Sequence, residues 1–81
     1  MTVVTLYGKP GCHLCEDAKA AIAEVRADTP FELREIDITL DPGLHRAYGE
    51  RIPVIAVDGI DTFEFFVDSN ALAEALDRVK P

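Results

Sequence analysis

The sequence predicts an α/β domain in which a four-stranded mixed sheet is flanked by three helices. Near the N-terminus, two β-branched runs enclose an amphipathic stretch, which is the pattern of a strand–helix–strand unit. In the second half, two further strand-like runs meet at an Asp58-Gly59 turn, and another amphipathic stretch follows them. With a short helix between the two halves, the order is βαβαββα. The 81 residues fit one domain, 1–81.

The first strand and the first helix lie on either side of two cysteines. TVVTLY, residues 2–7, is β-branched and aromatic and ends at a glycine, so it predicts a buried strand. From Cys12 to about Ala27 apolar residues recur at helical spacing, and a Thr-Pro pair then ends the pattern. The apolar face of this helix consists of Leu14, Ala18, Ala21, Ile22 and Val25.

The second strand is predicted at FELREIDI, residues 31–38, although its alternation changes phase. Phe31 and Leu33 fall on one face, whereas Ile36 and Ile38 fall on the other. Either a strand covered on both faces or a β-bulge would allow this change. Because a helix separates this strand from the first one, we expect the two strands to be parallel.

The second half of the chain begins with a short helix. Asp41 is its predicted N-cap, Pro42 its first residue and Gly49 its end. PVIAV and DTFEFF then form the two strands of a hairpin, and Ile60 leaves the length of the turn open.

A last helix is expected within residues 68–80. Asp68 or Ser69 is placed to cap its N-terminus. Its apolar face consists of Leu72, Ala75, Leu76 and Val79.

The composition is that of a globular protein with an acidic surface. The formal net charge is −7, and a field of this sign repels phosphate backbones, so we expect no nucleic-acid partner. The charge either serves solubility or attracts a basic partner. No apolar run is long enough to span a membrane, and the first residues lack the basic start of a signal peptide. We therefore expect a cytoplasmic monomer without membrane association.

The two cysteines form a Cys-X-X-Cys pair at the start of the first helix. In the cytosol such a pair is more often catalytic or metal-binding than a structural staple. Backbone N–H groups at the helix start favour the thiolate of Cys12, with Lys9 and His13 nearby, whereas Glu16 and Asp17 oppose it. Cys15 lies one turn deeper on the same face. This placement predicts that Cys12 attacks a disulfide and that Cys15 resolves the mixed disulfide.

Metal binding is the alternative use of the thiols. Two cysteines supply half of a tetrahedral zinc site, and His13 would point away from them on a helix. The chain has no second Cys-X-X-Cys pair. We therefore expect no metal and no bound cofactor within one chain. A metal or iron–sulfur cluster held between two copies through Cys12 stays open, as does an adaptor whose thiols are idle.

The whole chain resembles the glutaredoxin branch of the thioredoxin-like fold. The resemblance rests on LYGKPGCHLC at 6–15, ERIPVIAVDG at 50–59 and VDSNAL at 67–72, and the His-Leu pair between the cysteines is similar to that of small bacterial glutaredoxin-like proteins. It implies a disulfide oxidoreductase that serves electron transport and cell redox homeostasis, with Cys12 as nucleophile and Cys15 as resolving thiol.

The resemblance also implies which residues bind the substrate. Lys9 would help to hold a substrate or glutathione carboxylate. The bond between Ile52 and Pro53 would be cis, which would leave the Ile52 backbone free to pair with an extended substrate segment. Arg51 matches a basic residue of the family, or it is simply a solvated charge at a helix end.

Glutathione is a possible electron donor, and a flavoprotein of the thioredoxin reductase type is the other. Asp68 and Ser69 stand where the γ-glutamyl end of glutathione would bind, although plain capping explains them as well. Phe65 and Phe66 stand where the family usually has two glycines, and as strand residues only one of them would face the glutathione groove. Site or packing roles are both open for three further side chains, which are Tyr7, His45 and Tyr48.

Overall fold

The structure, a computed structural model, describes residues 2–78 and confirms the predicted order of elements. Val79, expected on the last apolar face, lies outside the described residues. The elements are β1 (Val3–Gly8), α1 (His13–Asp28), β2 (Glu32–Asp37), the short 3₁₀ helix η1 (Ile38–Leu40), α2 (Pro42–Tyr48), β3 (Val54–Val57), β4 (Ile60–Glu64) and α3 (Ser69–Arg78).

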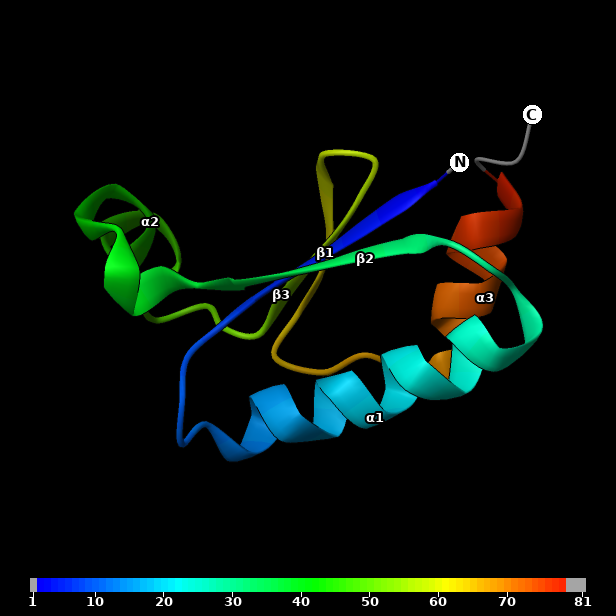
Figure 1. The fold of residues 1–81 in the computed structure, drawn as a ribbon, viewed down its shortest axis with the longest axis horizontal. Coiled ribbons are helices and arrows are strands. Elements are labelled where there is room, and N and C mark those ends of the chain that lie inside the picture. The colour runs from blue at the N-terminus through cyan, green and yellow to red at the C-terminus, as the bar shows by residue number, and fades with distance from the viewer. Residues whose placement is uncertain (1, 79–81) are drawn as a thin grey trace.

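The four strands form one mixed sheet in the order β2-β1-β3-β4. β1 pairs with β2 in parallel, and the other two pairs are antiparallel. In Figure 1, α1 runs along one side of the sheet, and α2 and α3 lie at its opposite ends. The fold is therefore the predicted α/β arrangement.

Two apolar clusters hold these elements together. The larger is the core, in which side chains of α1 and α3 pack on one face of β1 and β3. The smaller lies near α2 and is built around Cys15, Ile38 and Ile52. The buried residues of the main core are Val4, Leu6, Ala18, Ile22, Val25, Phe31, Ile55, Val57, Leu72 and Leu76.

The apolar residues of the second strand change phase because side chains cover both faces of the sheet there. β1 and β2 pair in unbroken register from Val3 to Gly8, so no bulge is involved. Leu33 packs against the main core, whereas Ile36 pairs with Tyr7 on the opposite face of the sheet. Ile38 lies beyond the strand, in η1, and is fully buried in the smaller cluster.

The helix caps follow the sequence closely. The Asp41 carboxylate accepts the N–H groups of Gly43 and Leu44 at 2.8 and 3.2 Å, with Pro42 as the first residue of α2. At α3 the cap is Asp68, whose Oδ2 accepts the N–H of Ala71 at 3.1 Å. These bonds satisfy backbone donors that have no partner inside a helix.

The hairpin has a two-residue turn and a shorter last strand than the sequence predicts. Asp58 and Gly59 have φ of 49° and 84°, and Val57 pairs directly with Ile60. Positive φ at both central residues matches the right-handed twist of the strands. β4 then ends at Glu64, so the prediction that Phe65 and Phe66 are strand residues is wrong.

Phe65 leaves the sheet because its backbone adopts the left-handed conformation, with φ of 66°. Its N–H donates to the carbonyl of Pro53 at 2.8 Å, which turns the chain away from β4. The side chains of Phe65 and Phe66 are 41% and 73% exposed. Neither ring is therefore buried in the core.

We predict that Phe65→Gly and Phe66→Gly change stability in opposite directions. A bulky residue pays about 1–2 kcal/mol for a left-handed backbone, so Phe65→Gly should raise the free energy of unfolding by about 1 kcal/mol. At Phe66 glycine relieves no such strain and adds freedom to the unfolded chain, so a loss of about 0.5–1 kcal/mol is expected. Urea unfolding measures both. A larger loss at Phe65 than at Phe66 would contradict the argument.

Candidate active site around the two cysteines

Cys12 is the N-cap of α1. Its backbone is extended, and its Sγ accepts the N–H of Cys15 at 3.3 Å. The preceding loop contains Gly11 with φ of 76°, which presents the cysteine at the helix start. A partly exposed sulfur in this position receives the positive end of the helix dipole, an arrangement that stabilises negative charge on the sulfur.

Cys15 is buried, with only 3% of its surface exposed. Burial raises the pKa of its thiol to about 11, the hydrogen bond with Cys12 adds to this rise, and the backbone N–H of Lys9 opposes it. Both cysteines are free thiols. The site therefore holds one accessible sulfur and one buried sulfur that is protonated at neutral pH, and the roles of attacking and resolving thiol stay a prediction.

The absence of a side chain at Gly8 leaves room for the Cys15 sulfur, a role that the sequence analysis does not predict. A Cβ atom at position 8 would come within 2.9 Å of Cys15 Sγ and 3.3 Å of its Cβ. Cβ atoms do not tolerate contacts this close, so any other residue here would push Cys15 away from β1. The sequence shows only a glycine at the end of a strand, because no spacing rule reveals which sulfur packs against it.

Ile52 joins the cysteines in the smaller cluster. It is 8% exposed and packs with Cys15 and Ile38, and Cys12 lies against the same cluster. The Ile52–Pro53 peptide bond is cis, as the resemblance implies. Since the Pro53 carbonyl binds the N–H of Phe65, the two exposed phenylalanines follow directly beside this segment.

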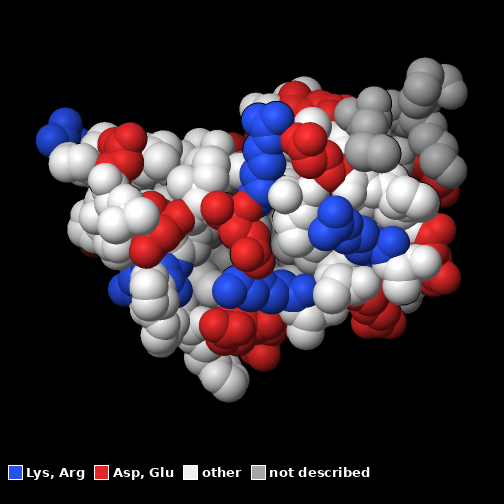
Figure 2. All heavy atoms as spheres, viewed as in Figure 1, with Lys and Arg blue, Asp and Glu red and all other residues white. Residues whose placement is uncertain are grey.

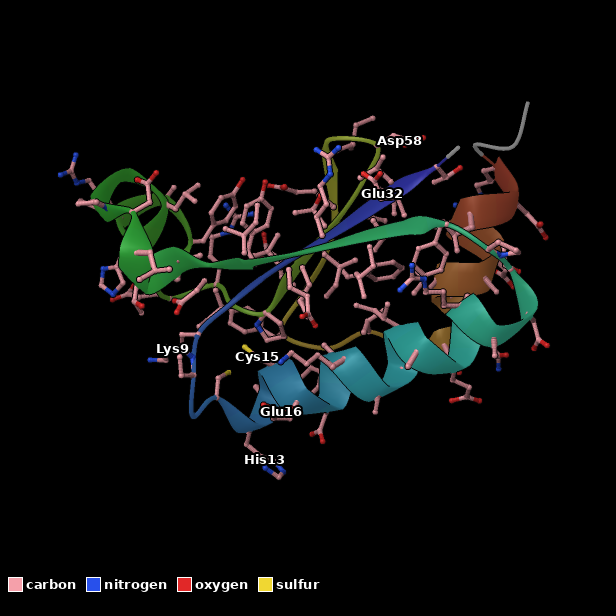
Figure 3. All side chains as sticks on the ribbon, viewed as in Figure 1. Lys9, His13, Cys15, Glu16, Glu32 and Asp58 are labelled. Carbon is pink, nitrogen blue, oxygen red and sulfur yellow. The ribbon has the colours of Figure 1, made fainter. Side chains whose placement is uncertain are left out.

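Lys9 and His13 are placed differently with respect to the sulfurs. Lys9 lies in the loop before Cys12, and its N–H and its charge both favour the thiolate of Cys15. His13 lies outside the site: its imidazole is exposed, 3.8 Å from the carboxylate of Asp17, and Figure 3 shows it pointing away from Cys15. The structure therefore does not bring the expected His13 charge to the thiols.

The polar residues on the other side of the sheet form a structural network. The Arg51 guanidinium binds Glu64, with Nε at 2.9 Å, and lies 3.5 Å from Asp61. It also lies over the ring of Tyr48, 5.2 Å from the centroid, and that ring stacks on Tyr7 at 4.5 Å. These contacts favour packing over substrate binding for Arg51, Tyr7 and Tyr48.

Tyr48 is held in this network by its hydroxyl as well. The Tyr48 hydroxyl donates to Asp61 at 3.5 Å, and burial followed by the Asp61 charge raises the pKa of this phenol. His45, the third residue whose role was open, is exposed on α2. Asp68 and Ser69 lie at the start of α3, where the Asp68 carboxylate caps the helix, so their role toward glutathione stays a prediction.

A pocket of about 440 Å³ opens beside Cys15, on the side of β2. Its position was not predicted, because it depends on the register between β1 and β2. Charged side chains surround it, and Figure 2 shows acidic and basic groups interspersed over this face of β2 and α1. The charged lining residues are Lys9, Glu16, Lys19, Glu35 and Asp37.

Neither a metal-binding cluster nor a membrane-spanning helix occurs within residues 2–78. In this range no group of three or more His, Cys, Asp or Glu side chains is arranged to hold a metal ion. None of the helices in the same range has the length and apolar character needed to cross a membrane.

Comparison with known proteins agrees with this geometry. Residues 3–77 match the family described as Glutaredoxin-like domain (DUF836). This chain belongs to that family. An uncharacterized protein of Mycobacterium tuberculosis is 30% identical over 80 residues, which cover 93% of this chain and 82% of the relative.

Solved structures place the glutaredoxin-like chain in the thioredoxin fold. The protein XcR50 of X. campestris superposes with a TM-score of 0.80 and 31% identity, covering 95% of this chain and 99% of that one. A thioredoxin mutant of Halobacterium salinarum reaches a TM-score of 0.74 at 21% identity, covering 99% and 75%. The second likeness shows the fold alone. Together with the Cys-X-X-Cys spacing, the family and the fold indicate a redox role.

We predict that iodoacetamide labels Cys12 at least about 100-fold faster than Cys15 at neutral pH. The buried Cys15 thiol has a pKa of about 11, and each pKa unit above an ordinary cysteine costs about tenfold in thiolate. Mass spectrometry of the single variants Cys12→Ser and Cys15→Ser, labelled over a series of times, gives both rates. Equal rates would contradict the assignment of the two thiols.

We also predict that Gly8→Ala slows the reaction of Cys15 but not that of Cys12. The added methyl group meets the Cys15 sulfur, so the variant should lose about 1–3 kcal/mol of stability and close the Cys12–Cys15 disulfide more slowly. Labelling of Cys12 should stay unchanged. Gly59→Ala is the matched control, since it is strained by φ of 84° but has open space around it and lies in the hairpin turn. Disulfide closure as fast in Gly8→Ala as in Gly59→Ala would overturn the role of Gly8.

Proposed function

We propose that this chain is a dithiol–disulfide oxidoreductase that reduces disulfides of proteins or small molecules in the cytoplasm as a monomer. The observation that carries the proposal is the pairing of an N-cap sulfur, Cys12, with a buried thiol one turn into the same helix. Cys12 Sγ accepts the backbone N–H of Cys15 at 3.3 Å, so the two cysteines lie close together, which supports a direct transfer between the two sulfurs.

The reaction proceeds in two exchange steps. The Cys12 thiolate attacks one sulfur of the substrate disulfide, forms a mixed disulfide, and releases the other sulfur as a thiolate that takes up a proton. Cys15 then loses its proton and attacks Cys12 Sγ. The bond from Cys12 to the substrate breaks, the second substrate thiol leaves, and a Cys12–Cys15 disulfide remains. Two electrons pass from the dithiol to the substrate.

Substrate binding is proposed along the segment that follows α2. Ile52 packs in the same cluster as Cys15, with Cys12 against it, so an extended segment paired with the Ile52 backbone would carry its own sulfur to Cys12. In this arrangement Pro53 flanks the docked segment and Lys9 holds a carboxylate. Asp68 and Ser69 would hold the far end of a glutathione molecule.

The electron donor of this proposed enzyme is either glutathione or a flavoprotein of the thioredoxin reductase type. We favour weak binding of glutathione. Phe65 and Phe66 replace the two glycines that the resemblance leads one to expect. Both rings are exposed, and the backbone N–H of Phe65 donates to the Pro53 carbonyl. Rings at this place fill the volume into which the glutathione backbone would otherwise fit.

A coupled assay tests the function and the donor together. We predict that disulfide reduction is abolished in Cys12→Ser, and that the Cys15→Ser variant accumulates mixed disulfides from which mass spectrometry identifies targets and donor. Turnover with glutathione and its reductase should be slow in the parent and about tenfold faster in Phe65→Gly or Phe66→Gly, which corresponds to ~1.4 kcal/mol of recovered binding. Turnover with thioredoxin reductase serves as the comparison.

Two results would count against these proposals. Activity that survives Cys12→Ser would remove the proposed reaction. Robust turnover with glutathione in the parent, with neither glycine variant any faster, would show that the two rings do not obstruct the donor.

A further inference from the structure

The pocket beside Cys15 contains groups that could accept the proton of the Cys15 thiol. The two-step reaction needs the Cys15 thiolate, yet this sulfur is buried and its pKa is raised to about 11. At neutral pH roughly one molecule in ten thousand would carry the thiolate without help. Burial is the main cause, and it persists when Cys12 is tied up in a mixed disulfide. A group that accepts the proton would therefore speed the second step.

The groups that face Cys15 from the smaller cluster and the loop are poor acceptors. Tyr48 is a neutral phenol whose hydroxyl already donates to Asp61, and Tyr7 stacks on its ring. Lys9, in the loop, carries a positive charge. Cys12 is itself bonded to the substrate at this stage. The remaining candidates line the pocket and are carboxylates.

Three carboxylates line the pocket, and two of them are badly placed. Asp37 binds the N–H and the hydroxyl of Thr39 at 2.9 and 2.6 Å, and these bonds lower the pKa of its carboxyl, which makes it a weak base. Glu16 directly follows Cys15 on α1, and adjacent helical residues do not face each other. The Glu16 side chain is also the more exposed of the two, at 66% against 51% for Glu35.

Glu35 approaches the pocket from the strand. It pairs in register with Leu6, so it projects on the face of the sheet that α1 covers. Lys19 of α1 spans the pocket to it: the Lys19 ammonium lies 3.9 Å from Glu35 and 4.0 Å from Glu16. This exposed ion pair adds little stability, but it keeps the Glu35 carboxylate at the pocket that Cys15 lines.

We propose that Glu35 accepts the proton of Cys15, through water in this pocket, when Cys15 resolves the mixed disulfide. The inference rests on the proposed function and adds a residue to it. The proton passes from Cys15 Sγ to pocket water and from water to the Glu35 carboxylate. The thiolate then attacks Cys12 Sγ, the departing substrate thiolate takes a proton from solvent, and Glu35 releases its own proton to solvent. Lys19 acts as a positioning residue.

Stopped-flow reaction with dithionitrobenzoate separates the two steps. Cys12 attacks the reagent and releases one thionitrobenzoate, and Cys15 then displaces the second from the mixed disulfide. The fast phase thus reports Cys12 and the slow phase reports Cys15. Both phases are followed as a function of pH in the full chain and in Glu35→Gln.

In Glu35→Gln we expect an unchanged fast phase and a slow phase reduced about 10²-fold at neutral pH, the usual effect of losing a proton acceptor. The pH profile should change as well. Without the carboxylate, the slow phase should rise about tenfold per pH unit toward pH ~11, because only spontaneous thiolate reacts. With Glu35 present the profile should be shallower, and a purely structural role would not alter this slope.

Two matched variants complete the test. Glu32→Gln removes the same charge from the same strand on the opposite face, and it should leave both phases unchanged. Glu16→Gln removes the other pocket carboxylate that pairs with Lys19 and should also leave the slope unchanged. A slow phase with parental rate and slope in Glu35→Gln, or a loss confined to Glu16→Gln, would overturn the inference. The absence of any Cys12 phase in the parent would instead refute the proposed function.

Discussion

The rest of the structure around the site depends on the close packing of the Cys15 sulfur against Gly8. This contact closes the gap between the last residue of β1 and the first turn of α1, at a place where a single methyl group would not fit. Because Cys15 is fixed there, its N–H points at the Cys12 sulfur and the helix begins where it does. Ile52, distant in sequence, packs with Cys15 in the smaller cluster. One close contact thus sets the helix start, the buried thiol and the cluster around it.

Stability and chemistry are divided between two clusters of apolar side chains. The main core lies between the sheet and the pair α1 and α3, and its buried members are all apolar. The smaller cluster contains both cysteines and two tyrosines, and it borders the α2 end of the sheet. The reactive sulfurs therefore lie at the edge of the packed interior, where burial can differ strongly between two residues only one helical turn apart.

Local features of the chain were predictable and long-range ones were not. The caps at Asp41 and Asp68, the hairpin turn and the helix start at Cys12 follow from short-range rules, and these fix the order of elements. The left-handed Phe65 depends on a bond to Pro53, which the sequence does not reveal. The same holds for Glu35, which meets the space under α1 only because β1 and β2 pair in one register. Hydrophobic periodicity predicts on which face of a strand or helix a residue lies, but not which residue of another element it contacts.

The proposed reaction needs a place where the substrate docks and a path by which the Cys15 proton leaves. The geometry around Cys15 puts these on different sides of the cysteine. Ile52 packs with Cys15, and Pro53, whose carbonyl accepts the N–H of Phe65, leads from Ile52 into β3. Glu35 and Lys19 line the pocket beside Cys15 toward β2, on the opposite edge of the sheet. A substrate docked along Ile52 would leave the β2 pocket open to solvent, so Cys15 could lose its proton while the mixed disulfide is in place. The Cys15 thiol is thus covered on the side of Ile52, where the substrate would dock, and borders the pocket on the side of β2.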